Sequence, residues 1–355
     1  MSIDVMNSSP RVIMITGAAG YVGAMLCDQF SKSPDLVSIV AVDKRSMPEI
    51  LKNNKKIIWL TANLHQNIWK IPALINKPEV IIHCAWQDGE LYGQEDLQRQ
   101  LNIKSTKNLM EFALTSPFVK KIVFFSSANC YGAMPENDSG KYFNENDSLH
   151  ESEYLYGREK IEAEAIVEDL YEASDKSKGV YVLRSAYIIG PRRHHVAGKK
   201  DLVGMLINIF PVVPNTSLHF SLQCVHEDDL IDLVGIITFT VVAPPNSFHV
   251  FNISAPGLIY CKDVAETFNK SITSLPPILV RAICFILWTF SSGKIQTPFG
   301  FWRYLCFPVL VDSSKMASQY DFDYVYTARQ ALDGKVGRYA SCDKDDSLNV
   351  GVQKQ

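Results

Sequence analysis

The sequence predicts an α/β fold, with a doubly wound parallel sheet and a smaller C-terminal substrate-binding region. Short apolar runs rich in Val and Ile alternate with helical patterns through the first half of the 355-residue chain. These runs do not alternate polar with apolar residues, which is typical of strands that helices bury on both faces. A glycine-rich segment follows the first run directly and indicates a tight turn from strand into helix. With 47% hydrophobic residues, the chain can fill the core of such a domain.

The apolar runs and the helical patterns set the order of the first elements. Five runs predict strands, at Val12–Thr16, Val37–Val42, Ile57–Leu60, Val80–Cys84 and Lys121–Ser126. Helices are expected between the strands, over Tyr21–Lys32 and Asp96–Thr115. A further helix, Ser152–Ala173, precedes another strand at Val180–Arg184.

The regular alternation ends after Gly190. Helices are still expected beyond it, at Leu202–Phe210, Glu227–Thr240, Lys262–Asn269 and Pro277–Phe290. We therefore expect a nucleotide-binding domain over residues 11–190, with strand and helix contributions from 220–255. Residues 191–332 are expected to form mainly the substrate-binding region, and the polar residues 333–355 a disordered tail.

Charge and cysteine usage argue against several classes of protein. The net charge is −3 and no long basic run occurs, so nucleic acid is not an expected partner. The eight cysteines are scattered without a C-x-x-C pair, which predicts free thiols rather than a disulfide framework. His226 has no second ligand at a suitable spacing, so no metal site is expected. Residues 1–10 lack the pattern of a secretion signal, and a cytoplasmic location is expected.

The most apolar window of the chain is Ile278–Phe290, which has thirteen residues and contains Arg281. A helix that spans a membrane needs about 20 residues. We therefore expect a buried helix here. A helix that lies on a membrane surface is the less favoured alternative.

The glycine-rich segment is Gly17-Ala-Ala-Gly20-Tyr-Val-Gly23, placed between the first expected strand and the first helix. One glycine suits a tight turn, one lets backbone N–H groups approach a pyrophosphate, and one permits close packing of helix on strand. In this context the G-x-x-G-x-x-G spacing predicts a dinucleotide site. Its expected contacts are Gly17, Ala19, Gly20, Tyr21, Val22 and Gly23.

Asp43 ends the second expected strand, twenty residues after Gly23. An acid at this place accepts hydrogen bonds from the adenine-ribose hydroxyls and repels a 2′-phosphate, so NAD is favoured over NADP. We expect Asp43 and Lys44 to contact the cofactor. Lys44 and Arg45 keep NADP open as the alternative, because a cation here can accept the phosphate. Asp43 can also be read as an ordinary acid of a strand-end turn.

Tyr156 and Lys160 stand four residues apart on an expected helix and so share one face. A protonated lysine near a phenol lowers the tyrosine pKa from about 10, and Tyr156 can then exchange a proton with a substrate oxygen. Ser127, after the fifth strand, can donate a hydrogen bond to that oxygen. Y-x-x-x-K alone is common by chance, but its combination with Ser127 and the glycine loop is not. The nearby Tyr154 has Arg158 rather than a lysine four residues further along the chain, so Tyr156 is the expected catalytic tyrosine.

These motifs resemble the extended short-chain dehydrogenase/reductases, and among them the NAD-dependent epimerase/dehydratase family. The resemblance runs from about Val12 to Leu332. It is carried by Thr16–Gly23, Val80–Ala85, Asn102–Leu109, Ser126–Gly132, Tyr156–Lys160 and Leu183–Pro191. Val225–Asp229 and Phe251–Ser254 match later landmarks of the family.

The resemblance implies a Rossmann-type domain in which Ser127, Tyr156 and Lys160 form the catalytic triad. It implies that Cys84 and Ala85 pass along the nicotinamide side, and that Tyr156 and Lys160 also contact the cofactor. Asn63 and Leu64 would lie near adenine. Asn102 would support the active-site helix or a water. A homodimer formed through the helices at 102–115 and 152–173 is also implied.

Several residues depart from the pattern of the resembling enzymes. Asn63 stands where relatives often carry Asp. Tyr187 stands where nucleotide-sugar enzymes commonly carry Asn, which weakens a nucleotide-sugar substrate. Ala128-Asn129 follows Ser127 in place of an Asp-Glu pair, so sugar dehydration is disfavoured. Arg192 opens a cationic segment that can meet a phosphate or carboxylate, or form a solvated loop. The expected substrate contacts are Ser127, Tyr187 and Arg192.

Three functions remain open at this point. The first is an NAD-dependent epimerase/dehydratase-type oxidoreductase, whose ketone product is reduced again, undergoes elimination or is released. The second is a dehydrogenase or reductase of an apolar alcohol or ketone, resembling 3β-hydroxysteroid dehydrogenases and flavonoid reductases. The third is a dinucleotide-sensing binding protein without catalysis, although such relatives usually lose the tyrosine or the lysine.

Overall fold

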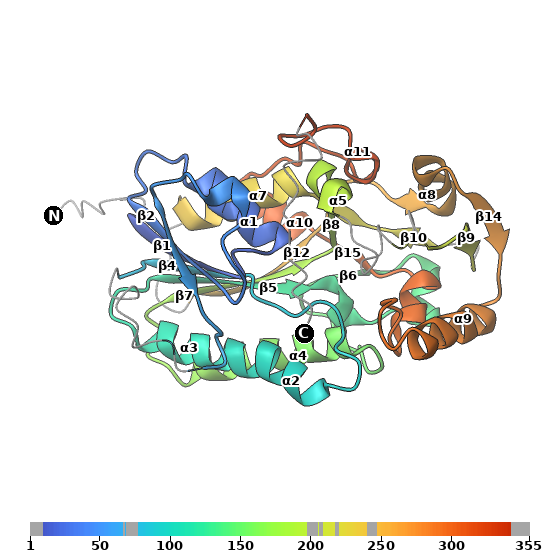
Figure 1. Cartoon of the computed structure of the whole chain (residues 1–355), viewed down its shortest axis with the longest axis horizontal. Helices are drawn as coiled ribbons and strands as arrows, with labels where there is room; N and C mark the ends of the chain where they lie inside the picture. Colours follow the sequence, from blue (N-terminus) through green and yellow to red (C-terminus); the bar gives the residue numbers. More distant parts are fainter. Residues whose placement is uncertain are drawn as a thin grey trace.

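A seven-stranded parallel sheet forms the centre of the molecule (Figure 1). The structure is a computed structural model that describes residues 10–66, 68, 77–196, 205, 209–216, 220–239 and 247–341. The strand order is β12-β7-β5-β4-β1-β2-β3, and all neighbouring pairs are parallel. The strands are β1 (Val12–Thr16), β2 (Ser38–Asp43), β3 (Ile57–Thr61), β4 (Val80–His83), β5 (Lys121–Ser127), β7 (Gly179–Ser185) and β12 (Phe248–Ile253). The predicted fold class is confirmed.

Helices cover both faces of the sheet, as Figure 1 shows. Helices α1 (Tyr21–Phe30) and α7 (Glu227–Phe239) lie on one face, and α3 (Ser105–Thr115) and α4 (Leu155–Glu172) on the other. Along β1, Ile13 and Ile15 join the core under α1, while Met14 joins the core under α3 and α4. Since successive side chains of a strand point to opposite faces, both faces need apolar residues, and the strand is an unbroken apolar run.

The helix expected over Asp96–Thr115 is interrupted. It consists of α2 (Glu95–Arg99), a π-helical turn at Gln100–Lys104, and α3. Such turns often occur at functional sites. This turn contains Asn102, one of the expected site residues.

The remaining elements lie beyond the sheet, at the end of the molecule opposite the N-terminus (Figure 1). They pair in short two-stranded sheets, β8 (Tyr187–Ile189) with β11 (Cys224–His226) and β9 (Val212–Asn215) with β14 (Ser271–Ser274). Helices α5 (Pro191–Val196), α8 (Cys261–Phe268), α9 (Pro277–Phe290) and α11 (Ala328–Asp333) also belong to this region. The helix expected at Leu202–Phe210 falls largely outside the described residues.

Two sequence-based expectations about burial are corrected. Helix α9 was expected to be buried, but only Val280 and Cys284 are buried within it. Its sequence is apolar all round, while the rest of the chain packs against one side of it only. Residues 334–341, expected to be disordered, pack against the domain, because Tyr339 is buried and bonds to Asp28. Residues 342–355 lie outside the described residues.

Within the part of the chain that the structure describes, seven cysteines are present and none forms a disulfide. No described helix is both long and apolar enough to cross a bilayer. The described residues also contain no cluster of His, Cys, Asp and Glu that could hold a metal ion.

A buried ion pair links the sheet to α4 and should dominate local stability. Arg184 on β7 donates to both carboxylate oxygens of Glu164, with Nη2–Oε2 at 2.7 Å. We expect Glu164→Ala to lower the free energy of unfolding by about 3–5 kcal/mol, because it leaves a buried guanidinium uncompensated. The exposed pair Arg99–Glu162 provides the control, and Glu162→Ala should cost less than about 1 kcal/mol. Denaturant unfolding measures both, and equal losses would contradict the expectation.

Candidate active site

The glycine loop joins β1 to α1 and is packed too closely to carry side chains. Gly17 has φ +71°, and a Cβ atom there would stand 2.6 Å from the backbone nitrogen of Ala85. A Cβ atom on Gly20 would come within 2.9 Å of the carbonyl oxygen of Gly17, and one on Gly23 would overlap the same oxygen. Gly17 thus makes the tight turn that the spacing predicts, in the left-handed region, and Gly20 and Gly23 lie too close to the Gly17 backbone to carry a side chain.

The N-terminus of α1 is open for an anion. No side chain caps this helix, and its first turn contains no acidic residue. The first N–H groups of a helix point outward and carry partial positive charge, so they form a ready site for a phosphate group. This end of α1 fits the pyrophosphate of a dinucleotide.

Asp43 lies at the end of β2, against the glycine loop. Its Oδ2 accepts a hydrogen bond of 2.9 Å from the backbone N–H of Ala19. Its Oδ1 accepts from the backbone N–H and from Nε of Arg45, at 2.9 and 3.1 Å. Lys44 Nζ donates instead to the side chain of Gln87, at 3.1 Å. The structure therefore brings Asp43 and the loop together, with a guanidinium group beside the carboxylate.

The other expected cofactor residues follow neighbouring strands at the same end of the sheet. Asn63 and Leu64 come after β3, whose Thr61 pairs with Asp43. Cys84 and Ala85 come after β4, and the backbone N–H of Cys84 donates to the Thr16 carbonyl oxygen at 3.2 Å. These residues and the loop thus share the carboxyl edge of the sheet, where ligands bind in open α/β folds.

Ser127, Tyr156 and Lys160 meet at the end of β5. Ser127 is buried as the last residue of the strand, while Tyr156 and Lys160 lie one turn apart on α4. Lys160 Nζ donates to the carbonyl oxygen of Phe125 at 2.7 Å and lies 5.8 Å from the centre of the Tyr156 ring. The ammonium also lies 3.5 Å from the ring centre of Trp86, which packs edge-on against Tyr156.

The protonation of this group differs from the prediction. The sequence predicts a lowered pKa for Tyr156, but burial and then the negative charge of Asp88 raise this pKa well above its ordinary value. A hydrogen bond with Ser127 acts in the opposite direction and is outweighed. Burial lowers the pKa of Lys160 to about 8, while Asp88 opposes that change. At neutral pH Tyr156 therefore carries its proton, and Lys160 is mostly charged.

Asn102 ties the active-site helix to the loop after β4. Its Nδ2 donates to Glu159 Oε2 at 2.7 Å, and its Oδ1 accepts from the backbone N–H of Gln87 at 2.7 Å. Glu159 lies on α4 between Tyr156 and Lys160. Asn102 is thus placed to position α4, which agrees with the supporting role that the resemblance implies.

Of the two arginines that open α5, Arg193 lies beside the glycine loop. Its guanidinium is 5.2 Å from the ring centre of Tyr21 and 5.7 Å from that of Tyr187. The guanidinium of Arg192, the expected substrate contact, is 5.1 Å from the ring of Tyr339 instead. The sequence shows two adjacent arginines and does not show which of them the turn of α5 directs toward Tyr21.

Glu227 links α5 to the glycine loop through hydrogen bonds. The sequence patterns did not identify it as a site residue. This fully buried carboxylate accepts from the backbone N–H groups of Arg192 and Arg193, at 3.0 and 3.3 Å, and from the hydroxyl of Tyr21. Burial raises its pKa to about 7. The signal was present in Val225–Asp229, where three acids in a row begin a helix, but that pattern is equally typical of a first helical turn.

Trp86, Asp88 and Tyr154 also surround Tyr156. The sequence patterns did not indicate that these three residues influence it. The charge of Asp88 affects both Tyr156 and Lys160. The ring of Tyr154 stacks on that of Tyr156 at 5.7 Å and also contacts Tyr304 at 5.3 Å. Trp86 and Asp88 lie three and five residues after the end of β4, and their place in the loop after a strand end could have pointed to them.

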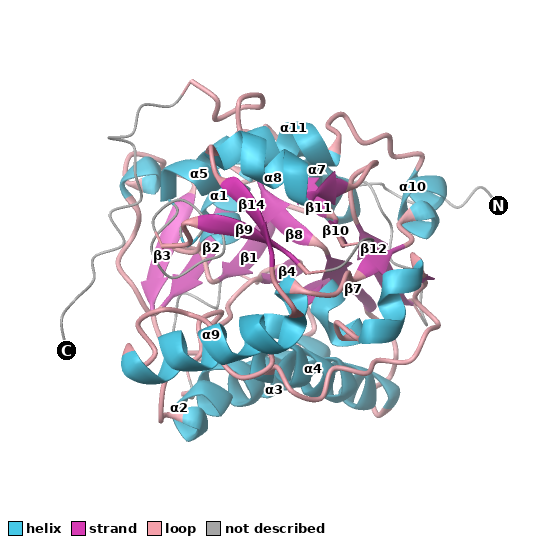
Figure 2. Ribbon diagram, turned by 90° about the vertical axis from the view of Figure 1, so that its right-hand side faces the viewer, coloured by secondary structure: helices cyan, strands magenta, loops and turns pink. Residues whose placement is uncertain are grey.

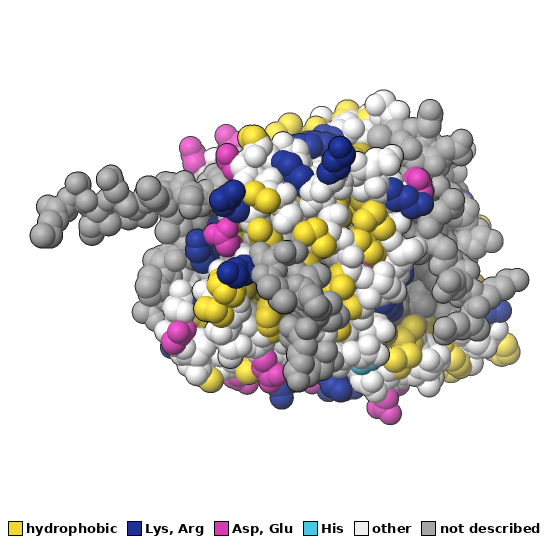
Figure 3. All heavy atoms as spheres, turned by 60° about the vertical axis from the view of Figure 1, so that its left-hand side comes forward, with side chains coloured by type: hydrophobic (Ala, Val, Ile, Leu, Met, Phe, Trp, Pro, Cys, Tyr) yellow, Lys and Arg dark blue, Asp and Glu magenta, His cyan; other side chains and the backbone are white. Residues whose placement is uncertain are grey.

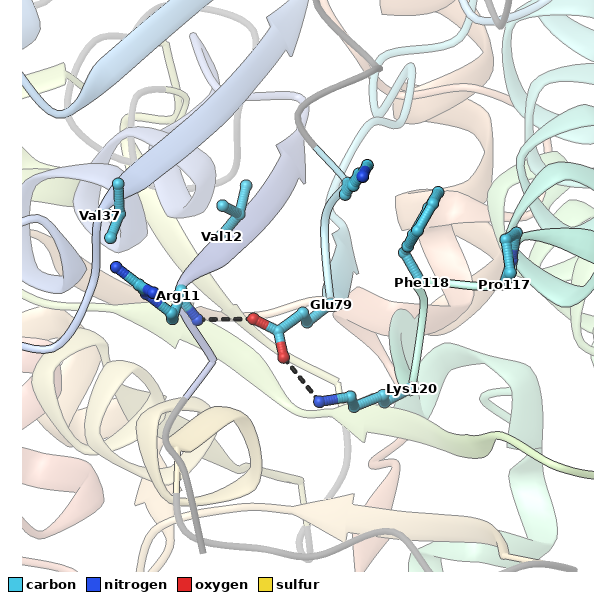
Figure 4. Close-up of a pocket in the computed structure, with 8 residues that line it drawn as sticks. Arg11, Val12, Val37, Glu79, Pro117, Phe118 and Lys120 are labelled. Atoms are coloured by element: carbon cyan, nitrogen blue, oxygen red, sulfur yellow. Dashed lines mark hydrogen bonds and ion pairs between the residues drawn. The ribbon is translucent and has the colours of Figure 1, made fainter. Parts of the chain in front are cut away.

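A hollow at the opposite end of the sheet is not part of this site. It lies at the amino ends of the strands and is lined by Arg11, Val12, Val37, Lys77, Glu79, Pro117, Phe118 and Lys120 (Figure 4). Glu79 bridges the Arg11 backbone N–H, at 2.8 Å, and Lys120, at 2.7 Å. Figure 3 shows basic and acidic side chains mixed with hydrophobic ones over the end that carries the N-terminus. Ligands of open α/β sheets bind at the other edge.

Comparisons with known proteins identify the family. A model of the NAD dependent epimerase/dehydratase family matches residues 13–241. The N-acetyl-alpha-D-glucosaminyl-diphospho-ditrans,octacis-undecaprenol 4-epimerase of Escherichia coli O157:H7 is 22% identical, over 94% of this chain and 97% of that protein. The sterol-4-alpha-carboxylate 3-dehydrogenase of Candida albicans is 28% identical, over 52% of this chain and 53% of that protein.

Among solved structures, the Bordetella bronchiseptica enzyme WbmG in complex with NAD and UDP has a similar fold. It is 18% identical, covers 96% of both chains and gives a TM-score of 0.69. The family match extends from β1 through α7 and includes the loop and helix that carry the motifs. The chain therefore belongs to the NAD-dependent epimerase/dehydratase family of enzymes, as its glycine loop and its tyrosine–lysine pair predict.

Proposed function

We propose that this chain moves a hydride between nicotinamide and the secondary alcohol or ketone carbon of a small molecule, with Tyr156 exchanging the proton. One observation carries the proposal. Ser127, Tyr156 and Lys160 come from the end of a strand and one turn of a helix, and Tyr156 and Lys160 both pack against Trp86. Trp86 follows Ala85, whose backbone lies against Gly17 of the glycine loop. A hydroxyl donor, a phenol and an ammonium in one place form an acid/base group for a carbon–oxygen centre.

Each residue has a defined task in this proposal. NAD, when bound, supplies the hydride acceptor or donor. Gly17, Gly20 and the first N–H groups of α1 hold its pyrophosphate, and Asp43 accepts from its ribose hydroxyls. Ser127 donates a hydrogen bond to the substrate oxygen. Tyr156 gives its proton to a carbonyl or takes one from a hydroxyl, and the charge of Lys160 stabilises the phenolate that remains.

Asp43 and Arg45 should set the choice between NAD and NADP. We expect Asp43→Ala to weaken NAD⁺ binding about tenfold, because a charge-assisted hydrogen bond contributes about 1.5–3 kcal/mol. The same change frees Arg45, which donates to both Asp43 oxygens, for a 2′-phosphate, so NADP⁺ should bind more tightly. Calorimetry measures both nucleotides. The double variant Asp43→Ala/Arg45→Ala is the control and should lose the gain in NADP⁺ affinity; a gain that persists would contradict this assignment.

The lowered pKa of Lys160 predicts a pH profile. Because this pKa is about 8, the ammonium is lost as pH rises through that value, and kcat/KM should fall above it. Lys160→Arg keeps a charge that does not titrate in this range, so the fall in kcat/KM of this variant should occur at higher pH. Lys160→Met should lower kcat/KM at every pH and remove the alkaline fall. An unchanged fall in Lys160→Arg would assign the titration to another group.

Two substrate classes fit the site. Epimerisation of a sugar hydroxyl is supported by the family and by the full-length similarity to the polyprenol-linked sugar epimerase. Oxidation of an apolar alcohol is supported by the ring of Tyr154, which stacks on Tyr156 and itself packs against Phe301 and Tyr304. The partial similarity to the sterol dehydrogenase also supports it. We assign the recognition of either substrate mainly to residues 191–332, together with Ser127 and Tyr187. Within that range Arg193 is the candidate next to the cofactor loop, because it lies beside Tyr21 and Tyr187.

A substrate screen with NAD⁺ separates these classes. It should contain UDP-glucose, UDP-N-acetylglucosamine, polyprenyl-diphosphate-linked N-acetylglucosamine and a 3β-hydroxysteroid. An epimerase forms the epimer without accumulation of NADH, whereas a dehydrogenase accumulates NADH in proportion to product. NAD⁺ binding without turnover of any member would favour the non-catalytic, dinucleotide-sensing alternative.

A further inference from the structure

Helix α9 carries an exposed apolar face that the active site does not explain. We define the α9 face as Ile278, Leu279, Ile283, Phe285, Ile286 and Phe290. All six side chains are exposed, Ile278 to 69%, Phe285 to 64% and Phe290 to 85%. Single exposed apolar residues are common on protein surfaces, but a contiguous group of this kind marks an interaction site.

The geometry of the helix makes this face continuous. Leu279, Ile283, Ile286 and Phe290 follow one another at intervals of three or four residues and so form one stripe along the helix. Val280 and Cys284 lie on the other side and pack against the buried Cys306. Figure 2 shows α9 lying lengthwise across the viewer's side of the molecule, on the outside of the fold. The helix is therefore held by one side and presents the other.

The stretch of chain that contains α9 carries charges of one sign. No Asp or Glu occurs between Glu266 and Asp312, whereas Lys270, Arg281, Lys294 and Arg303 all lie in this interval. Arg281 and Lys294 are exposed and flank the face. Arg303 is paired with Glu153, at 2.5 Å, so Arg281 and Lys294 are the cations that the argument uses. An apolar helical face with exposed cations beside it is typical of helices that lie in the surface of an anionic bilayer.

Helix α9 is also connected to the active site. The Trp288 ring packs against that of Tyr92 at 5.3 Å, and Gln296 accepts from the backbone N–H of Glu90 at 2.9 Å. Tyr92 and Glu90 belong to the segment that continues from Trp86 and Asp88. Helix α9 would therefore join a membrane, on its exposed face, to the segment that borders Tyr156, on another side.

We propose that α9 docks this protein on the surface of a lipid bilayer with anionic head groups. Its apolar face would enter the boundary between head groups and acyl chains, and Arg281 and Lys294 would meet the head groups. The helix has fourteen residues, too few to span a bilayer, so it lies in the surface. Docking does not depend on the proposed chemistry and can be tested without a substrate.

A second copy of this chain is the competing occupant, and charge argues against it. In a two-fold dimer the same patch faces itself, so the α9 face would meet another α9 face. The cations that flank it would then meet cations, and the stretch from residue 267 to 311 offers no acid to pair with them. Like charges placed together at an interface are unfavourable. A bilayer with anionic lipid supplies the opposite charge instead.

Vesicle co-sedimentation of the full chain tests the proposal. The vesicles are phosphatidylcholine alone, or phosphatidylcholine with phosphatidylglycerol. The wild type should bind the anionic vesicles, and Phe285→Ser/Phe290→Ser should bind them at least tenfold more weakly. Arg281→Gln/Lys294→Gln should lose the preference for phosphatidylglycerol. The control Val37→Ser/Val325→Ser changes two exposed apolar residues away from α9 and should bind like the wild type. Circular dichroism and thermal unfolding of each variant verify its fold independently of the cofactor site.

Three results would overturn the proposal. The first is a wild type that binds neither kind of vesicle. The second is a Phe285→Ser/Phe290→Ser variant that binds as well as the wild type. The third is a wild-type dimer, seen by sedimentation velocity, that this double variant converts to a monomer; the α9 face would then be an interface between two copies of the chain.

Discussion

Tyr156→Phe is expected to lower kcat/KM by about 10²–10⁴-fold, the usual contribution of a general acid or base. The change removes one oxygen and leaves the ring, which stacks on Tyr154 and packs against Trp86. Ser127, Lys160 and the glycine loop stay in place, so NAD⁺ should bind as before. Steady-state kinetics with the substrate found by the screen, together with calorimetry of NAD⁺, measures both quantities.

Tyr154→Phe is the matched control for this variant. Tyr154 is two residues away, its ring is stacked on Tyr156, and burial raises its pKa as well. It has no lysine one turn further along the helix, and Arg158, at that position, is exposed. Its loss of kcat/KM should stay below about tenfold. An equal or larger loss in Tyr154→Phe would move the proton transfer from Tyr156 to Tyr154.

Gly17→Ala is expected to remove most of the affinity for NAD⁺. A side chain at φ +71° is strained by about 1–3 kcal/mol, and its Cβ would stand 2.6 Å from the Ala85 backbone nitrogen. The loop can accept the methyl group only by moving away from β4, which also displaces the N–H groups of α1. We expect the Kd for NAD⁺ to rise by at least about tenfold, since each 1.4 kcal/mol is a factor of ten.

Gly93→Ala separates the effect of the close approach from that of backbone strain. Gly93 has φ +68°, nearly the value of Gly17, but a Cβ atom there meets nothing within 4 Å. This variant should lose some stability and keep its affinity for NAD⁺. Calorimetry and thermal unfolding of both variants make the comparison, and a similar loss of affinity in both would show that the loop geometry is not the cause.

The sequence was sufficient for the features that depend on local pattern. The strands are apolar on both faces because helices cover both faces, and each predicted run ends within one or two residues of the observed strand. The glycine loop and the Tyr156–Lys160 pair depend on spacings within one turn or one helix. Such spacings are read directly from the chain.

The features that depend on long-range packing were not predictable in this way. The sequence of α9 is apolar all round, and only the positions of its neighbours decide which side is buried. The pKa of Tyr156 is set by burial and by Asp88, which is 68 positions earlier in the chain. The choice between Arg192 and Arg193 depends on how Glu227 holds the first turn of α5.

Calorimetric titration of the wild type with NAD⁺ decides whether this chain carries a working NAD site next to Tyr156. We expect one NAD⁺ bound per chain, more tightly than NADP⁺. Absence of binding by either nucleotide, in a chain shown to be folded, would contradict this expectation.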